Sequence, residues 1–199
     1  MYARVVMLTG VQDIDAAVTY LQETALPILE SQRGYKGVSA GADRSAGLLG
    51  LLSLWETAAD REASDSALAK AREDARNDLA TGMTVELLDQ LAGKISKQPQ
   101  VGDALALTRI NIEPSRIAEN VERFNQEILP QVSQMAGFRS ARILINPSTG
   151  EGAVSSVWDN EQNRTAALEA AQAIRADAAT RGVTFGDRIL GEIVFSSLK

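Results

Sequence analysis

The stretch that decides the fold is residues 130–159, which read PQVSQMAGFRSARILINPSTGEGAVSSVWD. A degenerate copy lies 103 positions earlier, at residues 27–56, which read PILESQRGYKGVSAGADRSAGLLGLLSLWE. Both copies contain, in the same order, a proline, a glycine followed by an aromatic residue, a turn ending in glycine, and a tryptophan followed by an acidic residue. Because chemically matched residues at one constant offset are hard to produce by chance, we predict a tandem repeat of one domain.

Hydrophobic periodicity predicts the ferredoxin-like order of elements, βαββαβ, in each copy. In the first copy we expect strands at 2–9, 35–42, 48–56 and 91–96, helices at 13–31 and 58–80, and a short helical turn at 84–90. In the second copy we expect strands at 104–112, 138–145, 152–159 and 189–195, with helices at 115–135 and 161–181. Pro27 and Pro130 should kink the first helix of each copy near its end.

Residues 98–103 carry Pro, Gly and polar residues without periodicity, which is typical of a linker. We therefore expect one ferredoxin-like domain at 1–97 and a second at 104–199. The strand expected at 104–112 carries apolar residues on both of its faces, so the face away from the helices also needs cover. We predict an α+β fold in which the two βαββαβ units pack sheet to sheet as an intrachain α/β barrel, a pseudo-dimer within one chain. Whether several such chains assemble into a homo-oligomer is left open by the sequence.

Composition excludes several kinds of function. The 199 residues include no histidine, which removes the Ser-His-Asp triad, His-ligated metal sites and the commonest general base near neutral pH. They include no cysteine, so there is no disulfide framework or thiol nucleophile. The net charge of −6 argues against a general nucleic-acid binder. No apolar run approaches the roughly 20 residues of a membrane span, and no secretory signal is evident, so we expect a cytoplasmic protein without a membrane partner.

The repeated motifs resemble the dimeric α/β-barrel superfamily, and within it the antibiotic biosynthesis monooxygenase-like domains. The resemblance rests on Leu-Pro at the end of the first helix, then Gly-aromatic, then a hairpin whose second strand ends in Trp-acidic. It covers nearly the whole chain, twice. In such families two single-domain chains usually form the barrel, and here the resemblance implies that one chain supplies both halves.

The resemblance also implies site residues, because the family pocket lies between helices and sheet and receives an Asn from the first strand and the Trp that ends the third. Trp158 matches the family Trp, and Asn111 lies where the family Asn would. Arg109 shares a strand face with Asn111. We expect Asn111 and Trp158 to donate hydrogen bonds to a substrate oxyanion and Arg109 to stabilise its charge.

At the positions 103 residues earlier, the first copy lacks these polar residues. Trp55 matches the family Trp and is a candidate ligand-binding residue, but Leu8 stands at the Asn position and Val6 at that of Arg109. This asymmetry predicts that the second copy is the active one. Each of these side chains also has a purely structural interpretation. In that interpretation both tryptophans are core residues, Asn111 bonds a backbone group near a turn, and Arg109 forms an ion pair with an acidic residue of a helix.

The resemblance implies a cofactor-independent monooxygenase that oxidises a small aromatic, quinol or anthrone-type substrate with O₂, without metal or flavin. The haem-degrading branch of the family needs a histidine from the second helix, and this chain has none. The alternative is a non-catalytic α/β-barrel protein that binds a small apolar ligand or serves as an assembly module. A concave cavity that holds both Asn111 and Trp158 would favour the enzyme.

Overall fold

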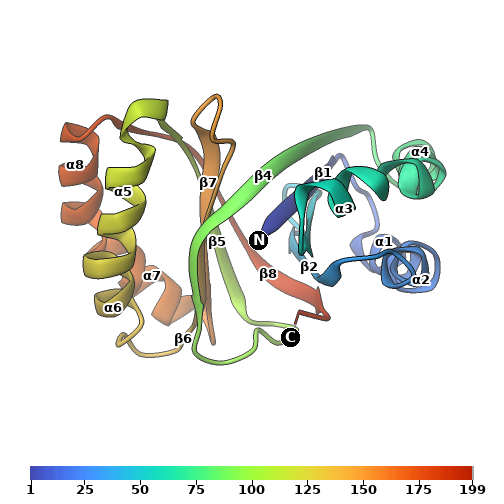
Figure 1. The fold of residues 1–199 in the computed structure, drawn as a ribbon. Helices are drawn as coiled ribbons and strands as arrows, with labels where there is room; N and C mark the ends of the chain where they lie inside the picture. Colours follow the sequence, from blue (N-terminus) through green and yellow to red (C-terminus); the bar gives the residue numbers. More distant parts are fainter. Residues whose placement is uncertain (199) are drawn as a thin grey trace. The chain divides into compact units, whose positions relative to one another are not determined.

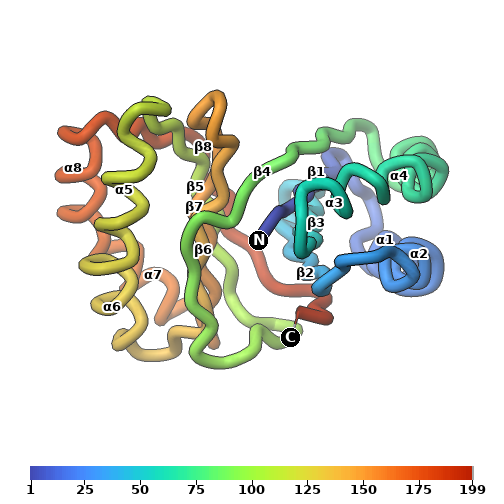
Figure 2. The backbone as a smooth tube through the Cα atoms, viewed as in Figure 1, coloured from blue at the N-terminus to red at the C-terminus, as the bar shows by residue number. Residues whose placement is uncertain are grey.

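The computed structural model describes residues 1–198, which divide into two compact units (Figure 1). The first unit comprises Met1–Leu87 and the segment that starts at Ile193, and the second comprises Leu88–Glu192. Two long strands, β4 (Gly82–Ile95) and β8 (Val183–Ser196), belong to both units, and Figure 2 follows each as an unbroken segment of chain. Each unit is therefore completed by part of a strand that continues into the other.

The first unit contains one sheet and helices on one side of it. Its strands are hydrogen-bonded in the order β4, β1, β3, β2, β8, and the pairs β1–β3 and β2–β3 are antiparallel. Its elements are β1 (Tyr2–Thr9), α1 (Ile14–Tyr20), η1 (Leu21–Ala25), α2 (Leu26–Glu30), β2 (Tyr35–Asp43), β3 (Leu48–Trp55), α3 (Ala58–Ala63) and α4 (Asp65–Leu79).

The second unit repeats this plan, with its strands in the order β8, β5, β7, β6, β4. The helices lie together on one face of these strands (Figure 1). Its elements are β5 (Ala104–Ile112), η2 (Pro114–Arg116), α5 (Ile117–Arg123), η3 (Phe124–Ile128), α6 (Leu129–Val132), β6 (Phe138–Ile145), β7 (Glu151–Trp158), α7 (Glu161–Ala170) and α8 (Gln172–Thr180).

Because β4 and β8 take part in both sheets, the strand order β1-β3-β2-β8-β5-β7-β6-β4 closes on itself as a barrel. The predicted α+β fold, a barrel made from ferredoxin-like units, is confirmed. Six of the eight strands begin and end within one residue of the predicted ranges, which shows how strongly apolar alternation and glycine turns specify them.

The late proline of each first helix follows one turn of π-helix. The π-turn η1 leads directly to Leu26-Pro27, and η3 leads directly to Leu129-Pro130. Proline has no N–H to donate and its ring crowds the preceding turn, so a wider turn before it accommodates the missing hydrogen bond. The kink predicted at these prolines therefore takes the form of a π-turn, after which the helix continues for about one turn.

The Gly-aromatic and Trp-acidic motifs pack against each other in each copy. Tyr35 contacts Trp55 edge to face with ring centroids 5.6 Å apart, and Phe138 contacts Trp158 in the same way at 5.5 Å. Edge-to-face pairs of this kind are favourable beyond the area that they bury. The glycine before each aromatic residue adopts a positive φ, 72° at Gly34 and 74° at Gly137, which lets the chain turn into the strand.

The short helical turn predicted at 84–90 is wrong, because these residues belong to β4, and β8 begins six residues before its predicted start. Residues Asp89–Ile95 of β4 pair with β6 in antiparallel register. Glu86, Leu87 and Leu88 are good helix formers by intrinsic propensity, but pairing with a neighbouring strand overrides that preference. The predicted second helices are each divided in two, at Ser64 and at Ala171.

Candidate functional site

The main candidate site is a cavity of about 160 Å³ inside the second unit, between its helices and one face of its sheet. Most of the lining is aliphatic or aromatic. The sheet contributes alternate residues of β5, and the helices contribute side chains such as Phe124, Ile128 and Ala178. The β5 residues are Ala106, Thr108, Ile110 and Ile112.

A few polar side chains reach this apolar cavity. Arg188 donates from Nε to Thr108 Oγ1 over 3.2 Å, and Asn120 donates from Nδ2 to the Arg116 carbonyl over 3.0 Å. Ser156 accepts a hydrogen bond of 3.0 Å from Trp158 Nε1. An apolar chamber with a small number of convergent polar groups is the usual form of a small-molecule site.

Two arginines give this cavity a positive character. The guanidinium of Arg175 lies over the ring of Phe185, 4.7 Å from its centroid, and Arg188 holds Thr108. Within residues 1–198 no carboxylate lies within ion-pair distance of either guanidinium. Charge of one sign beside an apolar chamber favours a ligand that carries the opposite charge.

Of the three predicted catalytic residues, Trp158 is the one that lies at the cavity. It is 1% exposed, lines the cavity and packs against Phe138. Its indole N–H is donated to Ser156 Oγ, so the expected hydrogen bond from Trp158 to a substrate oxyanion would have to replace this one and stays a prediction. The side chain can instead supply an apolar, aromatic wall.

Asn111 and Arg109 are not brought to this cavity. Successive residues of a strand face opposite sides of the sheet, and the cavity receives the even-numbered residues of β5. Asn111 is exposed near the end of β5 and Arg109 is partly buried, so they share a face, as predicted, but it is the face away from the cavity. The prediction that Asn111, Arg109 and Trp158 line one pocket is therefore wrong.

A one-residue difference between the copies explains the error. In strand pairing Tyr2 lies opposite Trp55, while Ala104 lies opposite Trp158. The first strands are thus related by 102 positions although the tryptophans are related by 103, and a shift of one residue exchanges the two faces of a strand. Leu8 corresponds to Ile110, and both positions are apolar. Val6 corresponds to Thr108, so the predicted asymmetry between a polar second copy and an apolar first copy is lost at the Asn position and remains, with Thr108 instead of Arg109, at the other.

The first unit contains a smaller cavity of about 80 Å³, in the same place between helices and sheet. Trp55, predicted as a ligand-binding residue, is completely buried but is not among the residues that line it. Its indole N–H donates to Ser53 Oγ over 3.2 Å. Trp55 is therefore placed as core, in agreement with the structural interpretation of this residue.

Sequence reasoning missed the polar residues that do reach the second cavity. Thr108 was visible as a polar residue on an otherwise apolar strand face, and Arg175 as a charge within an alanine-rich helix. Arg188 gave no signal, because it lies in the part of β8 that was not predicted as a strand. Within the described part of the chain, no three His, Cys, Asp or Glu side chains come together as a metal site, and no helix is long and apolar enough to cross a membrane.

No protein-family model matches the chain. Among curated proteins, it is 25% identical over 169 residues to Uncharacterized protein Rv2557 of Mycobacterium tuberculosis, a match that covers 82% of this chain and 75% of that protein.

Solved structures show the fold. An anthrone oxidase-like protein superposes with a TM-score of 0.70 at 13% identity, covering 98% of this chain and 92% of that chain. A monooxygenase-like protein of Listeria innocua gives 0.58 at 14% identity, covering 96% and 94%. A haem-degrading enzyme of Listeria monocytogenes gives 0.53 at 12% identity, covering 95% and 98%. The chain shares the fold of these proteins.

Proposed function

We propose that the second unit holds the active site of a cofactor-independent monooxygenase that oxidises a single-ring phenol or quinol with O₂. The observation that supports this most is the cavity beside Trp158, which is apolar except for a few polar groups and is flanked by two arginines without carboxylate partners among the described residues. The structural likeness to proteins named monooxygenase-like and anthrone oxidase-like agrees with it.

The size of the cavity favours one aromatic ring. An apolar cavity of about 150 Å³ is known to hold benzene, and the cavity of the second unit is about 160 Å³. A three-ring anthrone-type substrate would require the helices to move apart. We therefore narrow the expected substrates to single-ring compounds.

The charge of the cavity suits the anionic form of such a substrate. A phenolate oxygen near Arg188 would accept a charge-assisted hydrogen bond, which lowers the cost of ionising the phenol in an apolar place. The electron-rich anion can then transfer an electron to O₂. For a phenol with an unsubstituted para carbon, one oxygen atom enters at that carbon as a quinone oxygen and the other leaves as water, with the substrate supplying all four electrons.

Haem does not fit this site. Haem iron is held in proteins by His, Cys, Met or Tyr side chains. The chain has no His or Cys, and no Met or Tyr is found among the described residues that line the cavity. The likeness to a haem-degrading enzyme is therefore carried over to this chain only as a likeness of fold.

Oxygen uptake tests the proposal. We expect enzyme-dependent uptake with single-ring phenols or quinols, without added metal or flavin. Arg188→Met should reduce kcat/KM at least tenfold, which corresponds to about 1.4 kcal/mol of transition-state stabilisation. Ala178→Leu, which fills the cavity, should remove uptake, and Arg76→Met on an exposed part of α4 should leave it unchanged. Uptake that is equal in Arg188→Met, Ala178→Leu and the unaltered protein would place the reaction elsewhere.

A binding protein without catalysis is the second candidate. It is favoured by one observation: the described residues that line the cavity include no Asp, Glu, His, Lys or Tyr that could take the substrate proton. Under the enzyme proposal this proton passes to water. Saturable binding of phenols that Ala178→Leu removes, together with no oxygen uptake, would support the binding protein.

A further inference from the structure

The cavity of the first unit is lined by another pair of arginines than that of the second unit, which contains Arg175 and Arg188. Most of its lining is aliphatic, from residues such as Val6, Leu21 and Leu68, but Arg4 and Arg72 also line it. Arg4 lies on β1 with its side chain only 3% exposed, and the side chain of Arg72, on α4, is 19% exposed. A charged group this deeply buried is stable only if its charge and its N–H groups find partners.

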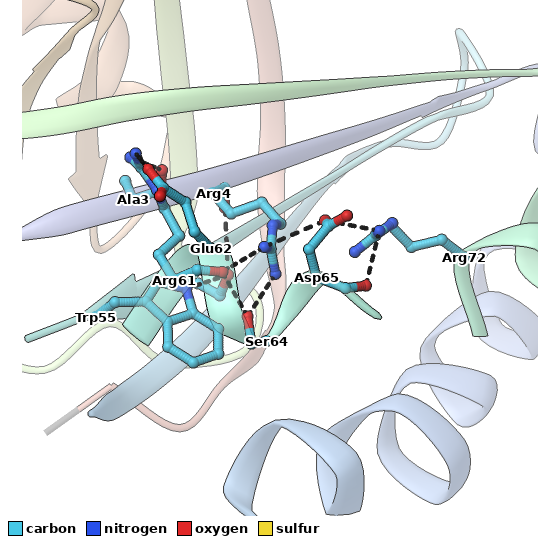
Figure 3. A network of polar contacts seen from close by, with 9 residues as sticks. Ala3, Arg4, Trp55, Arg61, Glu62, Ser64, Asp65 and Arg72 are labelled. Atoms are coloured by element: carbon cyan, nitrogen blue, oxygen red, sulfur yellow. Dashed lines mark hydrogen bonds and ion pairs between the residues drawn. The ribbon is translucent and has the colours of Figure 1, made fainter. Parts of the chain in front are cut away.

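Arg4 uses only part of its guanidinium for contacts within the fold. Figure 3 shows it reaching Ser64 and Asp65 at the junction of α3 and α4. Nη1 donates to Ser64 Oγ over 2.9 Å, and Nη2 donates to the Arg61 carbonyl over 2.6 Å and lies 3.3 Å from Asp65 Oδ1. The guanidinium carbon lies 5.7 Å from the centre of the Trp55 ring. Nε is buried and has no hydrogen-bond acceptor among the described residues.

Arg72 is also only partly satisfied. Its Nη2 donates to the Asp65 carbonyl over 3.1 Å and to Asp65 Oδ1 over 2.8 Å. Its Nη1 is buried without an acceptor within the described chain. A buried donor that stays unpaired destabilises the fold, because it has lost its hydrogen bonds to water. Two guanidiniums at one cavity therefore each retain an N–H group that a ligand could satisfy.

Arg4 and Arg72 share one carboxylate, that of Asp65. Figure 3 shows Arg4 and Arg72 on either side of Asp65, whereas the side chain of Arg61 extends toward Ala3 and Glu62. The Asp65 side chain is 59% exposed, and the nearest Glu62 oxygen is 3.9 Å from Arg61 Nη2. Burial lowers the pKa of Arg4, and repulsion from the Arg72 charge lowers it further. Because two guanidiniums share one carboxylate, the charge at this cavity favours a further anion.

Asp65 shows that one carboxylate can serve both arginines. Its Oδ1 lies within 3.3 Å of Arg4 Nη2 and 2.8 Å of Arg72 Nη2, so the two guanidiniums are close enough for a second carboxylate to bridge them. The second unit has no such pair, because Ala106 takes the register position of Arg4 opposite β7.

We propose that the cavity of the first unit binds a short-chain monocarboxylate. Its carboxylate accepts hydrogen bonds from Arg4 Nε and Arg72 Nη1, and its hydrocarbon chain lies among the aliphatic residues of the cavity. The volume of about 80 Å³ is close to half of the roughly 150 Å³ that holds the six carbons of benzene. The hydrocarbon part of the ligand therefore has about two or three carbons, as in propionate or butyrate. This site is independent of the proposed oxygenase site in the second unit.

Ligand-observed NMR titration of the full chain with butyrate tests this site, with butyramide as a neutral probe of the same shape. We expect butyrate to bind at least tenfold more tightly than butyramide, which corresponds to about 1.4 kcal/mol. Arg72→Met should weaken butyrate binding by at least tenfold, and the matched variant Arg76→Met, on an exposed part of the same helix, should bind as the unaltered protein does.

A second variant separates loss of the site from loss of the fold. Ala75→Leu fills the cavity but keeps both arginines, and it should remove butyrate binding while the circular dichroism spectrum stays unchanged. The proposal is overturned by equal binding of butyrate and butyramide, by no butyrate binding, or by binding that survives both Arg72→Met and Ala75→Leu. Displacement of butyrate by an equal concentration of inorganic phosphate would also overturn it, because it would show a site for any small anion.

Discussion

Gly34 and Gly137 decide how each aromatic pair is placed. Both have positive φ, and a Cβ at Gly34 would lie 2.5 Å from Asp60 Oδ2, while one at Gly137 would overlap the Asp159 carboxylate. Glycine is therefore needed at these positions for two reasons, the left-handed backbone and the lack of space.

Alanine at Gly34 should therefore destabilise the protein by more than backbone strain alone. The left-handed backbone costs roughly 1 kcal/mol for a residue with a side chain, and the overlap with Asp60 adds to it, for a total of about 2 kcal/mol or more. Gly102→Ala is the matched control, because Gly102 also has positive φ but no atom lies within 4 Å of the place that its Cβ would take. Denaturant unfolding measures both. Equal losses in the two variants would show that the contact with Asp60 carries no cost.

The residue scale is also where sequence reasoning failed for the site. Asn111 and Arg109 were assigned to the pocket from a constant offset of 103, but strand pairing relates the first strands by 102. A repeat detected from turns and tryptophans gives the offset of those landmarks only. One additional residue between β5 and Pro130 in the second copy leaves the later motifs at an offset of 103 and exchanges the faces of the first strand when that offset is applied to it.

At the scale of elements, the sequence was informative where a segment is specified locally. The β2–β3 and β6–β7 hairpins are bounded by glycine turns and alternate regularly, so their limits were predicted to within one residue. Only the end of β4 was predicted, as a strand at 91–96, and residues 84–90 were expected to form a helical turn. Glu86, Leu87 and Leu88 are helix formers, and the extended conformation here comes from pairing with strands far away in the sequence, such as Ile145 opposite Asp89.

The extended conformation of β4 makes a prediction about two adjacent leucines. Leu88 is 4% exposed and Leu87 is 42% exposed, as expected for neighbours on opposite faces of a strand. Leu88→Ala should cost about 2–4 kcal/mol of unfolding free energy, whereas Leu87→Ala should stay within about 0.5 kcal/mol. Urea unfolding compares them directly. Similar losses for both leucines would contradict the placement of this segment in β4.

At the scale of the whole molecule, the order of elements and the closed barrel followed from the sequence, because each copy repeats one pattern of strands and helices. The tandem repeat of one domain stays a prediction. The sequence did not indicate which of the two cavities is larger. The cavity of the second unit has about 160 Å³ and that of the first about 80 Å³. Cavity size depends on how side chains from several helices pack, and not on any local pattern.

Trp158 lines the larger cavity and Trp55 lines neither of the two, so tryptophan fluorescence can report which half binds an aromatic ligand. The measurement that tests the account most directly is titration with hydroquinone of two single-tryptophan variants, Trp55→Phe and Trp158→Phe. We predict saturable quenching in Trp55→Phe, in which Trp158 remains, and none in Trp158→Phe. Saturable quenching of Trp55 with a silent Trp158 would contradict an aromatic-binding site in the second unit.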